Sequence, residues 1–424
     1  MTTLGGVGGV GGVGGVGGVG GVGGVGGVGG VGGVGGVGGV GGGDTLGDAE
    51  SQTMGLISHR DGICGPWQGP QFEIWPDEDA GHIDDNGQLW RWDDWVRASV
   101  FDFELVSNLA FTLSPSNPPV GVTLWDRGFR NATSNGLPAF DAPQRIVEMY
   151  RPTKKIFREQ LTFMDRYSDL RAERANETLL QMGPQVAFWS TILYLSPQRT
   201  PKTLELLGTA VRFAIAVEMR FKHALACSRA IDYSPQVQPI IPTPGHGSLP
   251  SGHSTQAYII AGVMLDFFTE LRNTALPVAA GTAPSAVLRT QLYAQARRVA
   301  VNRTIAGVHF PVDTAAGHLL GTTLAEYFVH RCKYQNNRGN FVPRTFRGDA
   351  FIGTNDFDDQ EPLTWNAVPA GTPQTIAPKN VSPAYPHIEL AQPTTTHEGS
   401  KILAWLWNEA KSEWNDKSLI ANRV

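Results

Sequence analysis

A run of apolar residues with helical spacing, interrupted by positive charges, constrains the fold of this chain more than any other feature. Thr200-Pro201 predicts a helix start, because threonine caps helices and proline is tolerated at the first helical position. One stripe of this helix consists of Val211, Ile215, Met219 and Lys222. Arg229 follows Lys222 by two turns, about 10 Å along a helix axis, so we expect both cations to share an inward face. The alternative is that each of these two side chains lies along a partly buried face or pairs with a carboxylate.

Most of residues 143–331 has the same helical character. Residues 144–182 and 185–194 are predicted to be helical, and a proline-rich loop at 231–250 precedes a predicted helix over 254–271. Ser285 caps the next helix, whose inward stripe ends at Arg303, and Pro311 begins another helix after a break at Gly307. Strand signals are scarce, so we predict an all-α fold, a helical bundle.

Loop-rich segments flank this bundle. We predict a disordered tail at residues 1–50, a loop-rich N-terminal decoration at 51–142 with one short helix near 91–106, the functional bundle at 143–331, and a loop-rich extension at 332–424 that ends in a helix near 398–414. The extension is expected to pack on the bundle or on a second subunit, which makes a homo-oligomer possible.

Residues 5–40 consist entirely of Gly-Gly-Val repeats. A three-residue glycine period is typical of collagen, but collagen also needs proline, and none occurs in these repeats. Glycine loses the most conformational entropy on ordering, and one valine in three buries too little apolar surface to offset that loss. We therefore expect a disordered tail, with silk-like self-association as the alternative.

The formal net charge of −5 argues against a general nucleic-acid or anionic-membrane surface, so any cationic site must be local. The three cysteines, Cys64, Cys227 and Cys332, lie far apart and favour buried, inert thiols. The sequence shows neither an ordinary signal peptide nor an apolar run of about 20 residues. We expect a soluble, cytoplasmic protein without membrane contact, although export by an unusual route stays open.

The segment Pro250-Ser251-Gly252-His253 opens the helix predicted at 254–271. Glycine lets a ligand approach the backbone, and a helix N-terminus offers free N–H groups and the positive end of the helix dipole. The Ser251 hydroxyl adds another donor. This pattern indicates an anion-binding cradle, whereas the alternative is a simple helix cap.

A third motif reads Arg303-x3-Gly307-x-His309-x3-Asp313. His309 lies at the break before the last helix of the bundle, and Asp313 lies in its first turn, where a carboxylate can orient the imidazole through its second nitrogen. Taken alone, such a histidine is more often structural. Together, the three motifs supply three positive charges, hydroxyl and backbone donors, and two imidazoles, which suits a tetrahedral oxyanion such as phosphate or vanadate.

The ordered motifs Lys222-x6-Arg229, Pro250-Ser251-Gly252-His253 and Arg303-x3-Gly307-x-His309-x3-Asp313 resemble the signature shared by vanadium-dependent haloperoxidases and type 2 phosphatidic acid phosphatases. The chain looks most like the bacterial haloperoxidases. The signature covers residues 222–313, and the resemblance implies a vanadate cofactor or a phosphate substrate bound by a helical bundle.

The resemblance also implies residue roles. His309 would be the axial ligand of vanadium or the nucleophile on phosphorus, supported by Asp313, and His253 would be the acid–base residue. The residues expected around the equatorial oxygens are Lys222, Arg229, Ser251, Gly252 and Arg303. In a haloperoxidase, Lys222 would also polarise bound hydrogen peroxide before a halide attacks it, and the hypohalous product would react with a small organic acceptor.

The sequence departs from the family pattern at three positions. Ala230 follows Arg229 where proline is usual, Asn302 precedes Arg303 where serine is common, and Met219 stands where many haloperoxidases have tryptophan. His246, seven residues before His253, matches the spacing in algal bromoperoxidases and favours bromide over chloride. The alternative is a surface histidine in a loop.

Three functions remain open. The leading prediction is a vanadate-dependent haloperoxidase, because lipid-type phosphatases of the family are integral membrane proteins and its soluble acid phosphatases are usually shorter and exported. The second is a soluble phosphomonoesterase with His309 as its nucleophile. The third is a catalytically silent assembly protein in which the glycine-rich tail matters more than the site.

Overall fold

The computed structural model describes residues 86–114, 119–130, 139–275, 286–333, 341–363, 380–382, 384–394 and 399–414. The chain divides into two compact units, one comprising Met1–Ile83 and Gly87–Ser99, the other Asp84–Asn86 and Val100–Val424. In the first unit, the described part contains the 3-10 helix η2 (Leu89–Arg91) and the start of α4 (Asp94–Val106). The Gly-Gly-Val tail and Cys64 lie outside the described residues.

The all-α prediction is confirmed only in part, because the described residues are mostly helical but the second unit also contains a six-stranded sheet of order β10-β11-β9-β8-β5-β4. Strands β8 and β9 pair in parallel, and the other neighbours pair antiparallel. The strands are β4 (Leu109–Leu113), β5 (Gly121–Asp126), β8 (Gln144–Tyr150), β9 (Arg344–Arg347), β10 (Asn380–Ser382) and β11 (Tyr385–Leu390). A separate pair consists of β6 (Phe129–Arg130) and β7 (Ala139–Phe140).

This sheet joins the two segments that the sequence pattern predicts to be loop-rich decorations. Val147 of β8 lies opposite Arg344 of β9, so two strands that are far apart in the sequence are neighbours in the sheet. β5 and β8 are short and largely buried, and they carry β-branched and aromatic residues that suit strands. Such pairing cannot be detected within one short window of sequence.

The segment predicted to be helical at 144–182 begins instead as strand β8. Thr153 then caps α5 (Lys154–Ser168) by accepting a hydrogen bond from the N–H of Ile156 at 3.3 Å, and α6 (Arg171–Leu180) follows. The helix expected at 185–194 is a single turn, α7 (Val186–Trp189).

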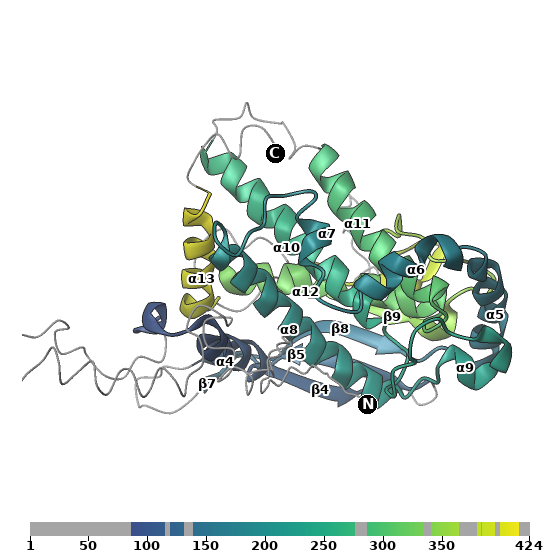
Figure 1. Cartoon of the computed structure of the whole chain (residues 1–424). Helices are drawn as coiled ribbons and strands as arrows, with labels where there is room; N and C mark the ends of the chain where they lie inside the picture. The colour runs from purple at the N-terminus through teal and green to yellow at the C-terminus, as the bar shows by residue number, and fades with distance from the viewer. Residues whose placement is uncertain are drawn as a thin grey trace, which may run out of the picture. The chain divides into compact units, whose positions relative to one another are not determined.

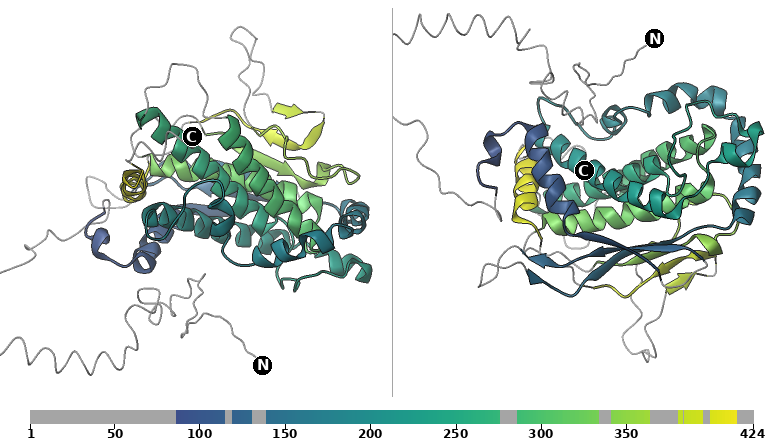
Figure 2. Two further views of the ribbon diagram at one scale, coloured as in Figure 1. Left: turned by 45° about the horizontal axis from the view of Figure 1, so that its top comes forward. Right: turned by 90° about the horizontal axis from the view of Figure 1, so that it is seen from below.

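The bundle itself agrees with the sequence prediction. Its long helices are α8 (Pro201–Leu225), α10 (Gly252–Ala275), α11 (Ala286–Ile305) and α12 (Pro311–Cys332), drawn in Figure 1. The starts predicted at Pro201, after Ser285 and at Pro311 are confirmed. The sheet packs on α8 and α12 through β5 and β8, and α13 (Lys401–Ser412) also packs on these two helices (Figure 2).

Small residues let α10 and α12 approach closely at the centre of the bundle. A Cβ atom on Gly317 would lie 2.6 Å from the Cβ of Ser254, and one on Gly321 would lie 2.5 Å from the carbonyl oxygen of Thr255. The side chains of α12 are buried along nearly its whole length. The contact therefore fixes the N-terminal ends of both helices relative to each other.

None of the described helices combines the length and the apolar character needed to span a membrane. Cys227 and Cys332 are buried free thiols, as expected, and burial raises the pKa of Cys227 to about 12.

Candidate oxyanion-binding site

Four helix ends meet around His309. Lys222 lies in the last turn of α8, Gly252 begins α10, and Arg303 lies in the last turn of α11. His309 lies in the turn before α12 and is only 4% exposed. This turn depends on Gly307, whose φ of 85° is in the left-handed region that favours glycine.

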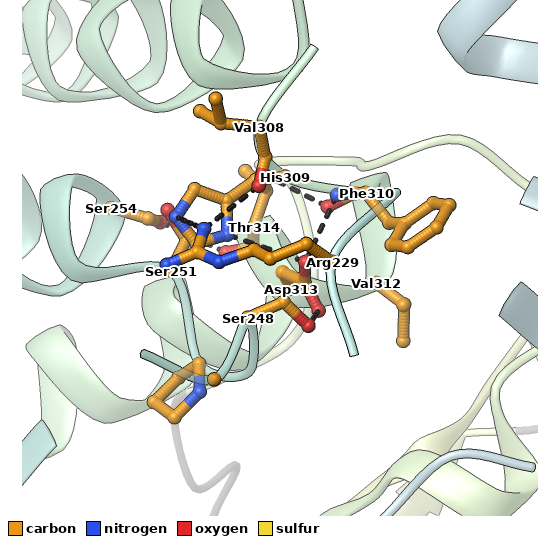
Figure 3. Close-up of polar contacts among 12 residues, drawn as sticks. Arg229, Ser248, Ser251, Ser254, Val308, His309, Phe310, Val312, Asp313 and Thr314 are labelled. Carbon is orange, nitrogen blue, oxygen red and sulfur yellow. Dashed lines mark hydrogen bonds and ion pairs between the residues drawn. The ribbon is translucent and has the colours of Figure 1, made fainter. Parts of the chain in front are cut away.

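The two ring nitrogens of His309 have different partners, as Figure 3 shows. Its Nδ1 lies 3.3 Å from Oδ2 of Asp313, and its Nε2 lies 3.1 Å from Nη1 of Arg229. Because a guanidinium can only donate, Nε2 carries the lone pair and Nδ1 donates its proton to Asp313. Burial, followed by the charge of Arg229, lowers the pKa of His309 well below its ordinary value. His309 is therefore neutral near pH 7, with a nucleophilic nitrogen facing Arg229.

Asp313 is fully buried in the first turn of α12. Its Oδ2 also accepts a hydrogen bond from the N–H of Phe310 at 3.0 Å, and its Oδ1 accepts one from the hydroxyl of Ser248 at 3.4 Å. Burial raises the pKa of Asp313 to about 6, although these donors and the charge of Arg229 oppose the rise. The same carboxylate thus caps the helix and orients the imidazole.

Arg229 is buried just after α8, beyond a turn in which Ala226 has a φ of 48°. Its Nε donates to the carbonyl of His246 at 2.9 Å, and its Nη1 donates to the carbonyl of Val308 at 2.8 Å. Its Nη2 lies 3.0 Å from Nδ1 of His246. The structure therefore brings His246 into contact with Arg229, but His246 itself is exposed.

Lys222 is 2% exposed and does not extend freely into the pocket. Its ammonium donates to the carbonyls of Pro250 at 2.5 Å, Ser248 at 3.2 Å and Gly247 at 3.3 Å. Burial lowers the pKa of Lys222 to about 8, and nearby Glu218 opposes that shift. All three N–H bonds are directed at the loop before α10, so Lys222 stabilises the cradle in this arrangement.

Ser251 and Gly252 form the start of α10, as predicted. The Ser251 side chain is fully buried, and its hydroxyl has no hydrogen-bond partner among the described residues. Gly252 lies against Glu218 of α8, since an added Cβ would come within 2.7 Å of Oε1 of Glu218. The Glu218 carboxylate accepts a hydrogen bond from Nε2 of Gln256 at 3.0 Å, and burial raises its pKa to about 7.

Arg303 and His253 face the C-terminal end of α6. Nη2 of Arg303 donates to the carbonyl of Thr178 at 2.9 Å and to Oε1 of Gln181 at 3.1 Å. Nε2 of the half-buried His253 lies 2.9 Å from the carbonyl oxygen of Gln181. Burial, followed by the charge of Arg303, lowers the pKa of His253 to about 3.

Buried polar atoms without a protein partner define what this site can bind. Within the described part of the chain, Nε and Nη1 of Arg303 and the hydroxyl of Ser251 are buried and make no hydrogen bond. Unsatisfied buried donors are costly, so a cluster of them indicates a missing ligand. The unpartnered atoms of Arg303 and Ser251 can donate hydrogen bonds, and together with the neutral imidazole of His309 they fit a tetrahedral oxyanion such as phosphate or vanadate.

The residues that sequence reasoning missed come from α6 and α8. Gln181 and Thr178 contact the expected pocket residues directly, and Glu218 packs against Gly252. Glu218 offered a weak signal, because it lies one helical turn before Lys222. Nothing in the sequence around Gln181 connects it to Arg303, because the two residues meet only through the packing of α6 against α11.

Comparison with known proteins gives three findings. The structure of a transmembrane PAP2 type phosphatidylglycerolphosphate phosphatase from Bacillus subtilis is similar over 41% of this chain and 84% of that chain, with 17% identity and a TM-score of 0.31. No protein of curated function matches. Residues 189–338, which contain every residue predicted for the pocket, match the sequence model of the PAP2 superfamily.

Proposed function

We propose that this chain hydrolyses phosphate monoesters, with His309 as the nucleophile. The observation that carries the proposal is the state of His309, whose proton is held on Nδ1 by Asp313 while Nε2 keeps its lone pair. The unpartnered donors of Ser251 and Arg303 supply the hydrogen bonds that a phosphoryl group needs. The match of residues 189–338 to the PAP2 superfamily supports the same chemistry.

In the first step, Nε2 of His309 forms a bond to phosphorus while the ester P–O bond breaks. Charge redistributes over the equatorial oxygens, and Arg229 and Arg303 stabilise it. The leaving alkoxide takes a proton from the imidazolium of His253, which then accepts a proton from the water that cleaves the phosphohistidine. The low pKa of His253 opposes its protonation, but the negative charge of a bound phosphate favours the imidazolium.

A vanadate-dependent haloperoxidase is the second candidate. The observation that favours it is the contact between His246 and Arg229, since the resemblance links His246 to bromide oxidation. Vanadate would be held by the residues that bind phosphate, His309 among them, and would supply activation of hydrogen peroxide toward a halide. Lys222 weighs against this candidate, because its three donors already point at backbone carbonyls.

A pair of assays distinguishes these functions. We expect the purified protein to hydrolyse p-nitrophenyl phosphate and vanadate to inhibit the reaction as a phosphate analogue. In parallel, vanadate-loaded protein is tested for peroxide-dependent bromination of phenol red. Bromination without hydrolysis would replace the proposal by the second candidate, and inactivity in both assays would leave the silent assembly protein.

Two histidine variants test the assigned nucleophile. His309→Ala is expected to reduce hydrolysis to background, because no other group occupies the position of Nε2. His223→Ala is the matched control, because His223 is exposed on the last turn of α8 and is expected to be dispensable. Full activity in His309→Ala would remove His309 from the mechanism.

A further inference from the structure

The C-terminal end of α6 contributes to the oxyanion pocket from outside the segment that matches the PAP2 superfamily. Gln181 is the C-cap residue of α6 and is fully buried. It precedes the matched segment, which begins at residue 189. Its contacts with Arg303 and His253 therefore come from outside the matched segment.

Every polar group of the Gln181 side chain has a partner. Its Oε1 accepts hydrogen bonds from Nη2 of Arg303 at 3.1 Å and from Nδ2 of Asn302 at 3.0 Å. Its Nε2 donates to Oε1 of Glu177 at 3.0 Å. The amide is thus oriented without ambiguity, because its donor side meets a carboxylate and its acceptor side meets two donors.

Gln181 also determines the tautomer of His253 through its backbone. The carbonyl oxygen of Gln181 lies 2.9 Å from Nε2 of His253, and a carbonyl can only accept. Nε2 therefore carries the proton, and Nδ1 carries the lone pair whenever His253 is neutral. One residue thus contacts both the cation expected to bind the oxyanion and the imidazole expected to move protons.

The network around Gln181 ties α6 to the end of α11. Glu177 accepts from Nε of Arg298 at 2.8 Å and from Nδ2 of Asn302 at 2.9 Å. Arg171, at the start of α6, donates to the carbonyl of Ile305 at 3.0 Å, at the last residue of α11. The position of Gln181 is therefore fixed relative to Arg303 from both ends of α6.

We propose that Gln181 is a positioning residue that holds Arg303 and His253 at one separation and keeps the proton of His253 on Nε2. The role within catalysis rests on the proposed phosphatase function. Because Gln181 and Thr178 engage Nη2 of Arg303, Nε and Nη1 are the nitrogens left for the oxyanion. The side-chain contacts of Gln181 help to hold its backbone carbonyl, which faces Nε2 of His253.

The test uses Gln181→Met in the full chain, which keeps the length of the side chain but removes its acceptor and donor. We expect kcat for p-nitrophenyl phosphate to fall roughly ten- to a hundredfold, with a smaller change in KM, because displaced catalytic groups weaken the transition state most. Gln185→Met is the matched control. Gln185 is a buried glutamine at the N-cap of α7, and its Oε1 has no partner within the described part of the chain.

A readout independent of activity follows His253 itself. In 15N-histidine spectra at neutral pH, the wild-type protein and Gln185→Met should show His253 protonated at Nε2, and Gln181→Met should show a mixture of tautomers. If Gln181→Met unfolds, the double variant Gln181→Glu with Glu177→Gln preserves the mutual hydrogen bond and the net charge, and should retain the wild-type tautomer.

The two proposals fail in different ways. A wild-type protein without hydrolytic activity would overturn the phosphatase function, while the His253 spectra would still test Gln181. Protonation of His253 at Nδ1 in the wild-type protein would overturn the inference. So would a Gln181→Met variant with the wild-type tautomer and wild-type kcat.

Discussion

Nη1 of Arg229 lies 3.1 Å from Nε2 of His309, so a permanent cation covers the lone pair of the proposed nucleophile. The same guanidinium is held by the carbonyls of His246 and Val308, which keep it beside the imidazole. A phosphoryl group that reaches Nε2 brings anionic oxygens next to Arg229, which can then donate to them. The contact thus keeps His309 neutral before the substrate binds and places a positive charge where negative charge develops.

The pKa of Asp313, raised to about 6, predicts that the plot of kcat/KM against pH has a limb that falls on the acid side. Above this pH the ionised carboxylate stabilises the positive charge that develops on His309, and below it the protonated carboxyl does not. We therefore expect kcat/KM to fall as the pH drops through about 6. Asp313→Asn should lower kcat/KM at pH 7.5 by roughly ten- to a hundredfold, and the limb near pH 6 should disappear.

The measurement for Asp313 is a profile of kcat/KM against pH from 4.5 to 8.5 for both proteins. Circular dichroism at each pH confirms that the proteins remain folded. An unchanged limb in Asp313→Asn would assign the titration to another group.

His246→Phe tests the exposed histidine that contacts Arg229. The change removes the acceptor 3.0 Å from Nη2 of Arg229 but leaves the backbone carbonyl that binds Nε. We expect KM for p-nitrophenyl phosphate to rise about three- to tenfold with little change in kcat, because one neutral contact of about 1 kcal/mol is lost. A kcat reduced as strongly as in His309→Ala would instead place His246 in the chemical step.

The helices that carry the pocket could be predicted because their signals are local. Pro201, Ser285 and Pro311 mark helix starts within one or two residues, and the cation at 222 interrupts a visible apolar stripe. His309 and Asp313 are four residues apart at a helix start, and this spacing alone predicts the contact that their side chains make. Local capping and periodicity therefore reveal the parts of the site that lie on consecutive helix ends.

The remaining features depend on contacts that no local window contains. Strand β8 pairs in parallel with β9, although the helices of the bundle lie between the two strands in the sequence. Gln181 meets Arg303 only because α6 packs on α11. Glu218 looks like an ordinary helical glutamate until its burial against Gly252 is known. These are effects of tertiary packing, which overrides the local preference of a segment.

Gly317→Ala tests the close approach of α10 and α12. The new Cβ would lie 2.6 Å from the Cβ of Ser254 and 2.7 Å from the carbonyl oxygen of Ser251, and neither atom is the end of a flexible side chain. The helices must separate, so we expect the free energy of unfolding in urea to fall by about 1–3 kcal/mol. Activity should also fall, because Ser251 belongs to the cradle.

Gly183→Ala is the matched control for this packing test. Its added Cβ meets only the carbonyl oxygen of Leu180, at an ordinary contact distance of 3.8 Å. Equal stability of Gly317→Ala and Gly183→Ala would show that α10 and α12 are not held at this distance in solution.

The Glu218→Gln variant is expected to be more stable than the wild-type protein, by an amount that depends on pH. Burial raises the pKa of Glu218 in the folded protein from 4.5 to about 7, so the folded state binds more protons than the unfolded state between these values. The stabilising contribution of the protonated carboxyl is complete below about pH 4.5 and is lost as the pH rises through about 7. Glutamine keeps the neutral shape at every pH, so Tm of Glu218→Gln should exceed that of the wild-type protein by a few degrees at pH 8.5 and match it near pH 4.5. Glu173→Gln is the control, because Glu173 is an exposed residue of α6, and its Tm should follow that of the wild-type protein at every pH. A Tm difference between Glu218→Gln and the wild-type protein that stays constant across the pH range would mean that Glu218 stays ionised beside Lys222.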